Sequence, residues 1–328
     1  MKIVVVVAWA SLVCMGAGST RGAALTPGDI LLSTGQLGAP SAVYEYTPGG
    51  TLVQTFPVTA PGPVDTAGRG VSVGSDGQIY LYDGTFSPAL TVINPLTGAL
   101  QSYRGIGFST ANNLTYGGVA AVGNYAFVSD MNTGGSPDTG IVRFNVTDFT
   151  SERFASGTEF ERVTLGEDGL LYGLNGDGFS GWPELYVWNP QTMELLRTVG
   201  LVGADIRAVA VAADGEIYTT ALDGYIREFT PDGTLVKTLQ SKDDGYDIAL
   251  LPSGAIVASA WGTVVVTDTS LNSYSEWSIP TGPLFVASAT SPVPEPATLL
   301  PAALGAVGIL VSRRRRRNSE MRVFPQRS

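Results

Sequence analysis

The 328-residue chain contains no histidine. This absence removes the commonest general base, the commonest zinc ligand and every serine-histidine-aspartate arrangement. Carboxylate chemistry and metal sites built from oxygen ligands are the alternatives that remain. The composition therefore narrows any catalytic function to chemistry that aspartate, glutamate and neutral side chains can perform.

Cysteine is nearly absent as well, since Cys14 is the single one. It lies in an apolar run from Ile3 to Gly16 that follows Met1 and Lys2 and precedes small residues, a pattern typical of a secretory signal peptide. We assign the signal to residues 1–24, with cleavage after Ala17 or Ala24. The mature protein would then have no disulfide, so its stability must come from core burial and hydrogen bonds. A lipoprotein signal fits poorly, because Val13 stands where a small residue is expected.

Basic residues are scarce outside the ends. Of 19 basic and 29 acidic residues, nine and two respectively lie in the terminal segments. The body, residues 25–292, keeps 10 basic and 27 acidic residues, a net charge near −17. Such a surface repels nucleic acid and anionic lipid headgroups, so neither is expected as a partner of the body. Solubility of an exported protein would explain the same charge.

A second apolar stretch runs from Ala297 to Val311, and its flanks are distinctive. It is short for a membrane span, which usually needs about 20 residues. The residues before it are Val293, Pro294, Glu295 and Pro296, and those after it are Arg313, Arg314, Arg315, Arg316 and Arg317. The prolines favour extended backbone before the membrane, and the arginine cluster stays on the cytoplasmic side. We therefore expect a linker at 291–297, a transmembrane helix at 298–312 and a basic cytoplasmic tail at 313–328.

This order resembles the tripartite PEP-CTERM sorting signal of certain bacterial surface proteins. The resemblance covers residues 292 to 317 and implies processing by a membrane protease of the exosortase type. It implies a protein that is exported, anchored in the inner membrane before sorting, and then placed at the cell surface or outside the cell. An ordinary C-terminal anchor would explain the apolar run and the arginines without the Pro-Glu-Pro motif.

Glycine (41) and proline (20) are abundant, which indicates many turns between short strands. A repeat organises them, with equivalent positions 47, 45, 46 and 39 residues apart. Those positions are Tyr80, Phe127, Tyr172, Tyr218 and Val257. In each copy an apolar strand runs into Asp-Gly or an equivalent turn, and a second strand ends in the aromatic. A third strand, a turn such as Asn94–Gly98 or Thr230–Gly233, and a fourth strand follow.

Four antiparallel strands in about 45 residues predict one blade of a β-propeller. The blades resemble those of the NHL and gluconolactonase-like propellers. The first unit lacks its first strand, and Leu284–Ala289 remains as a spare strand at the other end. We expect this strand to complete the first blade, which gives an all-β, six-bladed propeller over residues 25–290. Seven blades would result if the stretch from Thr110 to Thr158 held extra strands. The regularity of the Asp-Gly copies favours a propeller over a two-sheet sandwich.

Acidic residues near strand ends are the candidates for ligand binding. The resemblance to gluconolactonase-like enzymes implies a divalent metal in the channel, held by carboxylates and amides, but no motif of that family maps onto this chain. The candidates are Asp65, Asp83, Asp130, Asp138, Asp177, Asp205, Asp243 and Asp244. Turn formation, capping and solvation explain such residues equally well.

Two further features fall outside the repeat. Trp182, in a glycine-rich loop, could stack on a sugar ring or cover a blade edge. Asn113 and Asn145 begin glycosylation acceptor sequences.

These features favour a non-enzymatic cell-surface or extracellular-matrix propeller that binds exopolysaccharide or surface proteins, with no catalytic residue and no cofactor assigned. The alternative is a metal-dependent propeller hydrolase or lactonase of the calcium type. A structural spacer without a ligand is a third interpretation.

Overall fold

A computed structural model describes residues 22–34, 42–58, 68–84, 88–108, 117–130, 139–175, 183–203, 205–241 and 243–289. The first 21 residues, Trp182, Asn113, Asp65, Asp138, Asp177 and everything from residue 290 onward lie outside these ranges. The sorting motif, the expected membrane helix and the arginine cluster are thus not part of what the structure describes. Within the described ranges, no helix has the length and hydropathy needed to cross a membrane.

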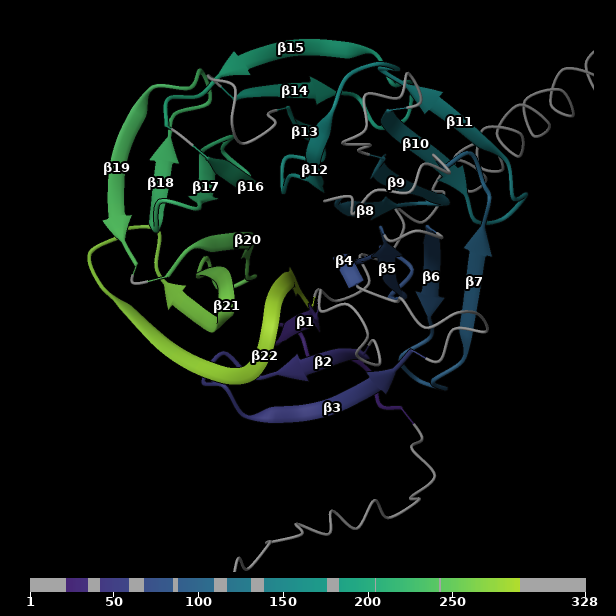
Figure 1. The fold of residues 1–328 in the computed structure, drawn as a ribbon, viewed down its shortest axis with the longest axis horizontal. Helices are drawn as coiled ribbons and strands as arrows, with labels where there is room; N and C mark the ends of the chain where they lie inside the picture. The colour runs from purple at the N-terminus through teal and green to yellow at the C-terminus, as the bar shows by residue number, and fades with distance from the viewer. Residues whose placement is uncertain are drawn as a thin grey trace, which may run out of the picture. The chain divides into compact units, whose positions relative to one another are not determined.

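The described strands form the blades of a six-bladed β-propeller, arranged radially around a common axis (Figure 1). Four blades are separate four-stranded sheets. The second blade contains β4 (Gly68–Val73), β5 (Ile79–Asp83), β6 (Ala89–Ile93) and β7 (Leu100–Arg104). The third contains β8 (Val119–Val122), β9 (Tyr125–Asp130), β10 (Gly140–Asn145) and β11 (Ser151–Phe154). The fourth contains β12 (Phe160–Leu165), β13 (Leu171–Asn175), β14 (Glu184–Trp188) and β15 (Leu195–Gly200). The fifth contains β16 (Ile206–Val211), β17 (Ile217–Ala221), β18 (Tyr225–Phe229) and β19 (Leu235–Gln240). The stretch that could have held a seventh blade supplies the third blade.

The remaining strands form one six-stranded sheet that spans the first and sixth blades. It contains β20 (Gly245–Leu250), β21 (Ile256–Thr267), β22 (Tyr274–Ser288), β1 (Ile30–Thr34), β2 (Ala42–Tyr46) and β3 (Leu52–Pro57). The first part of β21 pairs with β20 and its second part with β22, and Gly262, with φ of 73°, lies between them. The strand β21 therefore supplies both middle strands of the sixth blade.

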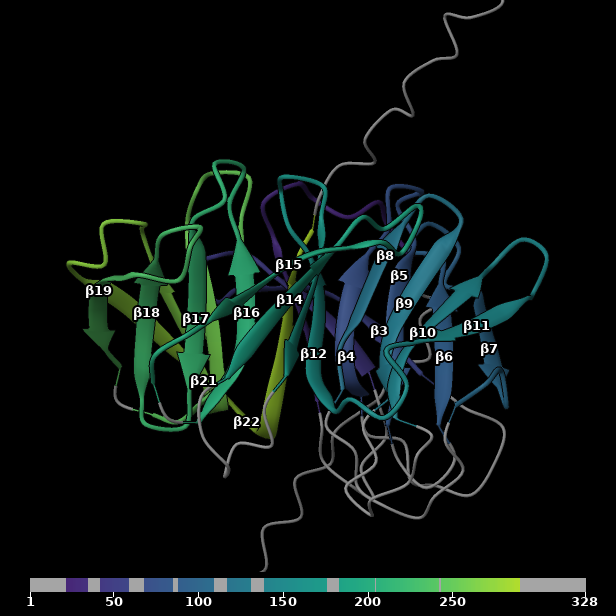
Figure 2. The same ribbon diagram turned by 90° about the horizontal axis from the view of Figure 1, so that it is seen from above.

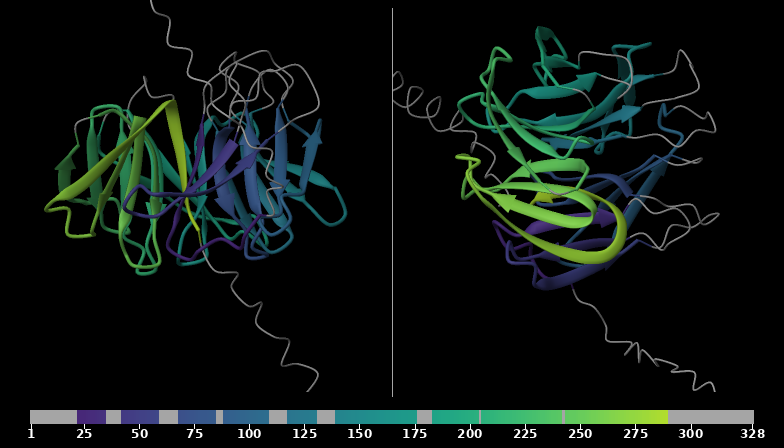
Figure 3. Two further views of the ribbon diagram at one scale, coloured as in Figure 1. Left: turned by 90° about the horizontal axis from the view of Figure 1, so that it is seen from below. Right: turned by 60° about the vertical axis from the view of Figure 1, so that its left-hand side comes forward.

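The strand β22 belongs to two blades. Its first part, Tyr274–Ser278, pairs with β21, and its second part, Leu284–Ser288, pairs with Ile30–Thr34 of β1. Figures 1 and 3 show it, in yellow, running along the outside of the sixth blade and then turning inward beside β1. The inward part of β22 thus lies next to β1 in the same sheet.

The turns that link first and second strands follow from the Asp-Gly copies. Gly77, Gly169, Gly215 and Gly254 all have positive φ, between 73° and 88°, which confirms the predicted turns. Tyr80, Tyr172 and Tyr218 are buried, as expected of blade core. The prediction that each aromatic ends its strand was wrong: these tyrosines are the second residues of β5, β13 and β17. Each of these strands begins one residue before the tyrosine and continues for three residues after it.

Hydrophobic clusters fill the spaces between neighbouring blades. One cluster joins Tyr172 of β13 to Phe229 of β18, and another joins Leu32 of β1 to Val264 of β21. Every pair of adjacent blades shares such a cluster. Inner strands also approach closely: a Cβ on Gly118 would lie 2.8 Å from the backbone nitrogen of Val163. Figure 2 shows the strands of the blades running between the two faces of the ring.

Candidate functional site at the centre of the ring

The first residues of the innermost strands share a local irregularity. The pairing of inner and second strands skips one residue in four blades, which is the signature of a β-bulge. The skipped residues are Arg69, Glu161, Arg207 and Tyr246. Bulges re-aim a side chain and often lie beside functional sites. Here three of the four skipped residues, Arg69, Glu161 and Arg207, are charged.

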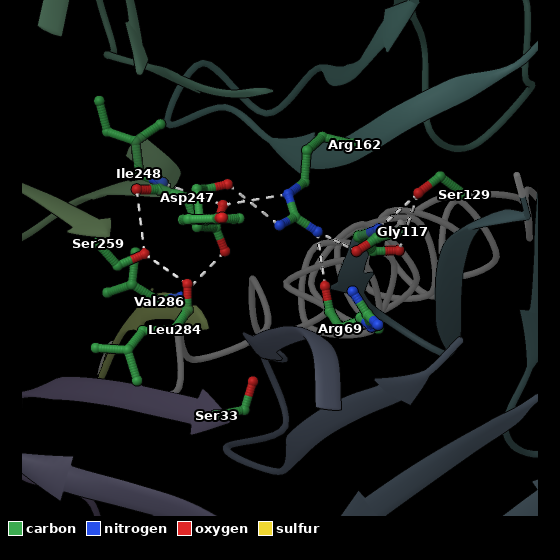
Figure 4. Close-up of polar contacts among 12 residues, drawn as sticks. Ser33, Arg69, Gly117, Ser129, Arg162, Asp247, Ile248, Ser259, Leu284 and Val286 are labelled. Carbon is green, nitrogen blue, oxygen red and sulfur yellow. Dashed lines mark hydrogen bonds and ion pairs between the residues drawn. The ribbon is translucent and has the colours of Figure 1, made fainter. Parts of the chain in front are cut away.

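Arg162, the residue after one of these bulges, connects most of the blades (Figure 4). From β12 of the fourth blade, its Nη1 donates to the carbonyl oxygens of Arg69, at 2.6 Å, and of Gly117. Its Nη2 donates to the carbonyl of Tyr246, at 3.3 Å. Its guanidinium carbon lies 4.4 Å from the ring centroid of Phe285. The planar guanidinium of Arg162 thus contacts residues of the first, second, third and sixth blades.

Asp247 is the acidic partner of Arg162, with 3.5 Å between Oδ1 and Nε. The same carboxylate accepts hydrogen bonds from the backbone N–H groups of Ile248, at 3.1 Å, and Val286, at 3.0 Å. It therefore ties β20 to the inward part of β22. Beside it, the Ser259 hydroxyl donates to the carbonyl of Leu284 at 2.8 Å, a second link between the same two blades.

Burial dominates the electrostatics of this pair. It raises the pKa of the Asp247 carboxyl above its ordinary value of 3.8, and Arg162 and the two N–H donors oppose that rise. It lowers the pKa of Arg162, against the attraction of Asp247 and Glu161. Because a guanidinium keeps its proton in proteins, the carboxylate stays beside a fixed positive charge.

A second buried ion pair joins the fourth and fifth blades. Arg207 Nη1 donates to Glu161 Oε1 at 2.7 Å, and the side chains are only 9% and 2% exposed. Removing one member of such a pair leaves an uncompensated buried charge, which is strongly destabilising. All six inner strands are therefore connected through polar contacts near the axis.

The predicted acidic candidates divide into two groups. Asp83 and Asp130, at the ends of β5 and β9, are buried rather than solvated. Asp130 Oδ2 lies 2.6 Å from Arg153 Nη2, so this carboxylate is part of an ion pair. Asp205, just before β16, is half-buried, and Asp243 and Asp244, before β20, are exposed. No group of three or more metal-binding side chains occurs among the described residues.

Asn145, the described member of the two acceptor sequences, has a local role. Its Oδ1 accepts hydrogen bonds from the backbone N–H groups of Thr147 and Asp148. Asn94 and Asn189 do the same in the equivalent turns of the second and fourth blades. The asparagine is thus explained by the turn between third and fourth strands.

Sequence reasoning missed the arginines and one aromatic pair. Arg69 and Arg207 occupy the same place in the repeat, 11 residues before Tyr80 and Tyr218, and that register was the available signal for these two, whereas Arg162 lies one place later in its copy. Trp261, at the turn inside β21, is 62% exposed, and its ring centroid lies 6.3 Å from that of Tyr246. Nothing in the repeat marks Trp261, because its exposure follows from its place between the two halves of β21.

Comparisons with known proteins add little beyond the architecture. No protein-family model matches the chain, and no curated protein matches it. A solved structure titled "Structure of Dos1 propeller" is 14% identical, with a TM-score of 0.48, over 79% of this chain and 72% of that one. A protein of unknown function from Bacteroides caccae is 11% identical, with a TM-score of 0.39, over 76% and 73%. The propeller assignment therefore rests on the strand pairing.

The ion pairs and hydrogen bonds at the centre of the ring hold neighbouring blades together. Asp247 and Glu161 each face an arginine, and Asp247 also accepts two backbone hydrogen bonds. The Asp247 carboxylate therefore has few lone pairs left for a metal ion or a substrate.

Proposed function

We propose that this chain is an exported cell-surface or extracellular-matrix propeller that binds or scaffolds other molecules without catalysing a reaction. The observation that carries the proposal is the state of the central carboxylates. Asp247 and Glu161 are committed to Arg162 and Arg207, so the axis of the ring joins blades rather than presenting reactive groups. The acidic body argues further against nucleic acid as a partner.

The cellular location of the protein is proposed from both ends of the sequence. The segment 1–24 would direct export, and the helix at 298–312 would hold the chain in the inner membrane with its basic tail inside. The motif Val293–Pro296 would then be processed by an exosortase-type membrane protease. Support comes from the order of the three parts, Pro-Glu-Pro, apolar run and arginine cluster.

The strand β22 bears on the same proposal. It ends at Ser288, five residues before Val293. We propose that its pairing with β1 closes the ring in solution and that the sorting segment follows a finished domain. Removal of that segment would then leave the propeller folded.

The sorting proposal is tested by the double variant Glu295→Ala/Pro296→Ala. We expect it to stay in the inner membrane as the unprocessed chain, which fractionation and the mass of the C-terminal fragment would reveal. The matched control is Glu320→Ala/Pro325→Ala, which removes the same residue types beyond the arginines. If the first variant is trimmed and released like the control, the motif does not direct sorting.

The non-enzymatic part of the proposal has a separate check against the metal-dependent hydrolase. The melting temperature of the protein is measured with calcium and with a chelator. Equal values fit a propeller held by its own ion pairs. A clear rise with calcium, removed by the chelator, would favour the metal-dependent alternative instead.

A further inference from the structure

Trp261 has an unusual position among the described tryptophans. Trp188 is buried, and Trp277 donates its Nε1–H to the carbonyl of Pro48 at 3.2 Å. Trp261 is 62% exposed at the turn within β21. Exposing a tryptophan forgoes one of the largest gains available from burial, and tryptophan is enriched where a partner later covers it.

The surroundings of Trp261 form a corner that we call the Trp261 corner: Asp243, Asp244, Tyr246 and Trp261. The Tyr246 and Trp261 rings lie 6.3 Å apart at 58° to each other, so they form two walls rather than a stack. Arg162 donates to the carbonyl of Tyr246, which anchors the backbone of one wall to the centre of the ring.

Two carboxylates accompany the aromatic walls. Gly245 pairs with Ala260, so Asp244 and Trp261 are each one residue away from this pair along their own segments. Asp243 and Asp244 are both exposed. The segment 241–246 carries two aspartates and one lysine, so it is net negative.

We propose that the Trp261 corner binds a basic side chain, lysine or arginine, presented by a peptide segment of a protein partner. This rests on the proposed binding function and names its partner class. An aromatic face attracts an organic cation, best of all at tryptophan, and nearby carboxylates add attraction and hydrogen-bond acceptors.

The charge of the whole body supports the same partner. Four of its ten basic residues, Arg69, Arg162, Arg207 and Arg227, are buried. Seven of the described acidic residues are buried as well, so burial removes little of the acidic excess of the body. Such a surface steers a basic partner toward the corner and repels an acidic one.

The test measures binding of a synthetic peptide of alternating lysine and glycine to the full chain in mild detergent. The same peptide with every lysine acetylated keeps the length and loses the charge. We expect the parent to bind the first peptide and not the second, with affinity that falls as salt rises. Trp261→Ala should weaken binding about tenfold, the loss of a partly desolvated cation–aromatic contact.

Two control variants make comparable changes at exposed residues outside the Trp261 corner. Leu96→Ala removes exposed apolar surface from a turn of the second blade, and Glu167→Gln removes one charge at the turn after β12. Both should bind like the parent, whereas Asp244→Asn should bind several-fold more weakly.

Equal binding of the two peptides, or equal affinity of Trp261→Ala and Leu96→Ala, would overturn the proposal. So would Trp261-dependent binding of a neutral oligosaccharide in place of the peptide, which would assign the corner to sugar. These outcomes leave the sorting experiment untouched, because that experiment reads processing of residues 293–296. Failure of the proposed peptide binding and failure of the proposed sorting can therefore be told apart.

Discussion

At the residue scale, one carboxylate explains why the second and fourth blades pair Asp-Gly with a tyrosine, whereas in the fifth blade Tyr218 donates to Glu216 instead. Asp76 Oδ1 accepts from the backbone N–H of Gln78, and its Oδ2 accepts from the Tyr80 hydroxyl at 2.9 Å. Asp168 does the same for Leu170 and, at 2.5 Å, for Tyr172. The aspartate therefore fixes the turn and satisfies the polar end of a buried ring.

The variant Tyr172→Phe isolates this hydroxyl. It should lower the free energy of unfolding by about 1 kcal/mol, the net value of one hydrogen bond, because the exposed Asp168 can turn to water. Tyr172→Ala should cost about 3–5 kcal/mol, since it also empties the space of the ring. Urea unfolding measures both, and equal stability of parent and Tyr172→Phe would show that the hydroxyl contributes nothing.

The pH dependence of this difference has a definite sign. Burial, and then Asp168, raise the pKa of the Tyr172 phenol above its ordinary value of 10. The folded state thus holds the proton more tightly than the unfolded one, and this contribution is lost as the pH rises above 10. The Tyr172→Phe deficit should therefore shrink in alkaline solution.

At the element scale, the bulged inner strands matter because they aim charged side chains at one another. Arg162 spans from β12 to residues of β4, β20 and β22: its N–H groups donate to carbonyl oxygens of β4 and β20, and its guanidinium lies over the Phe285 ring of β22. Buried acceptors without donors are costly, so the inner strands depend on this one side chain.

Replacing Arg162 by methionine keeps much of the length of the side chain and removes every donor. We expect a loss of about 3–5 kcal/mol in the free energy of unfolding, because Asp247 becomes a buried charge without its partner. Arg197→Met, on the exposed outer strand β15, changes the same residue type and should cost less than about 1 kcal/mol. Similar losses for the two variants, measured by denaturant unfolding, would refute the central role of Arg162.

The repeat made the blades predictable from the sequence, whereas the centre of the ring was not. The Asp-Gly turns and the buried tyrosines announce strands through local signals that recur every 45 residues or so. Arg162 gives no such signal, because an arginine beside an apolar strand is ordinarily solvated. Its contacts depend on bulges and on strands from blades distant in sequence. Trp261 was missed for a related reason: its exposure depends on its place between the two halves of β21, which no repeated signal in the sequence marks.

At the scale of the whole molecule, the ring behaves as a chain of blades whose neighbours share cores. The last of these cores is made of Leu284 and Val286 from β22, Ile30 and Leu32 from β1, and Val264 from β21. The termini of the described propeller therefore meet within one sheet. Stability should depend steeply on this contact between the first and sixth blades, since opening it exposes two blade edges at once.

Two truncations separate the contribution of the β22–β1 contact to stability from that of the C-terminal segment. A chain ending at residue 290 keeps all of β22, and a chain ending at residue 282 loses the part that pairs with β1. The longer form should unfold like the parent body. The shorter form loses the buried side chains of Leu284, Phe285 and Val286, each worth about 1.5–3 kcal/mol. That loss is comparable with the entire stability of a typical domain, about 5–15 kcal/mol, so the shorter form should be largely unfolded at room temperature. Circular dichroism melting distinguishes the two, and matching melting curves would mean that β22 does not hold the ring closed.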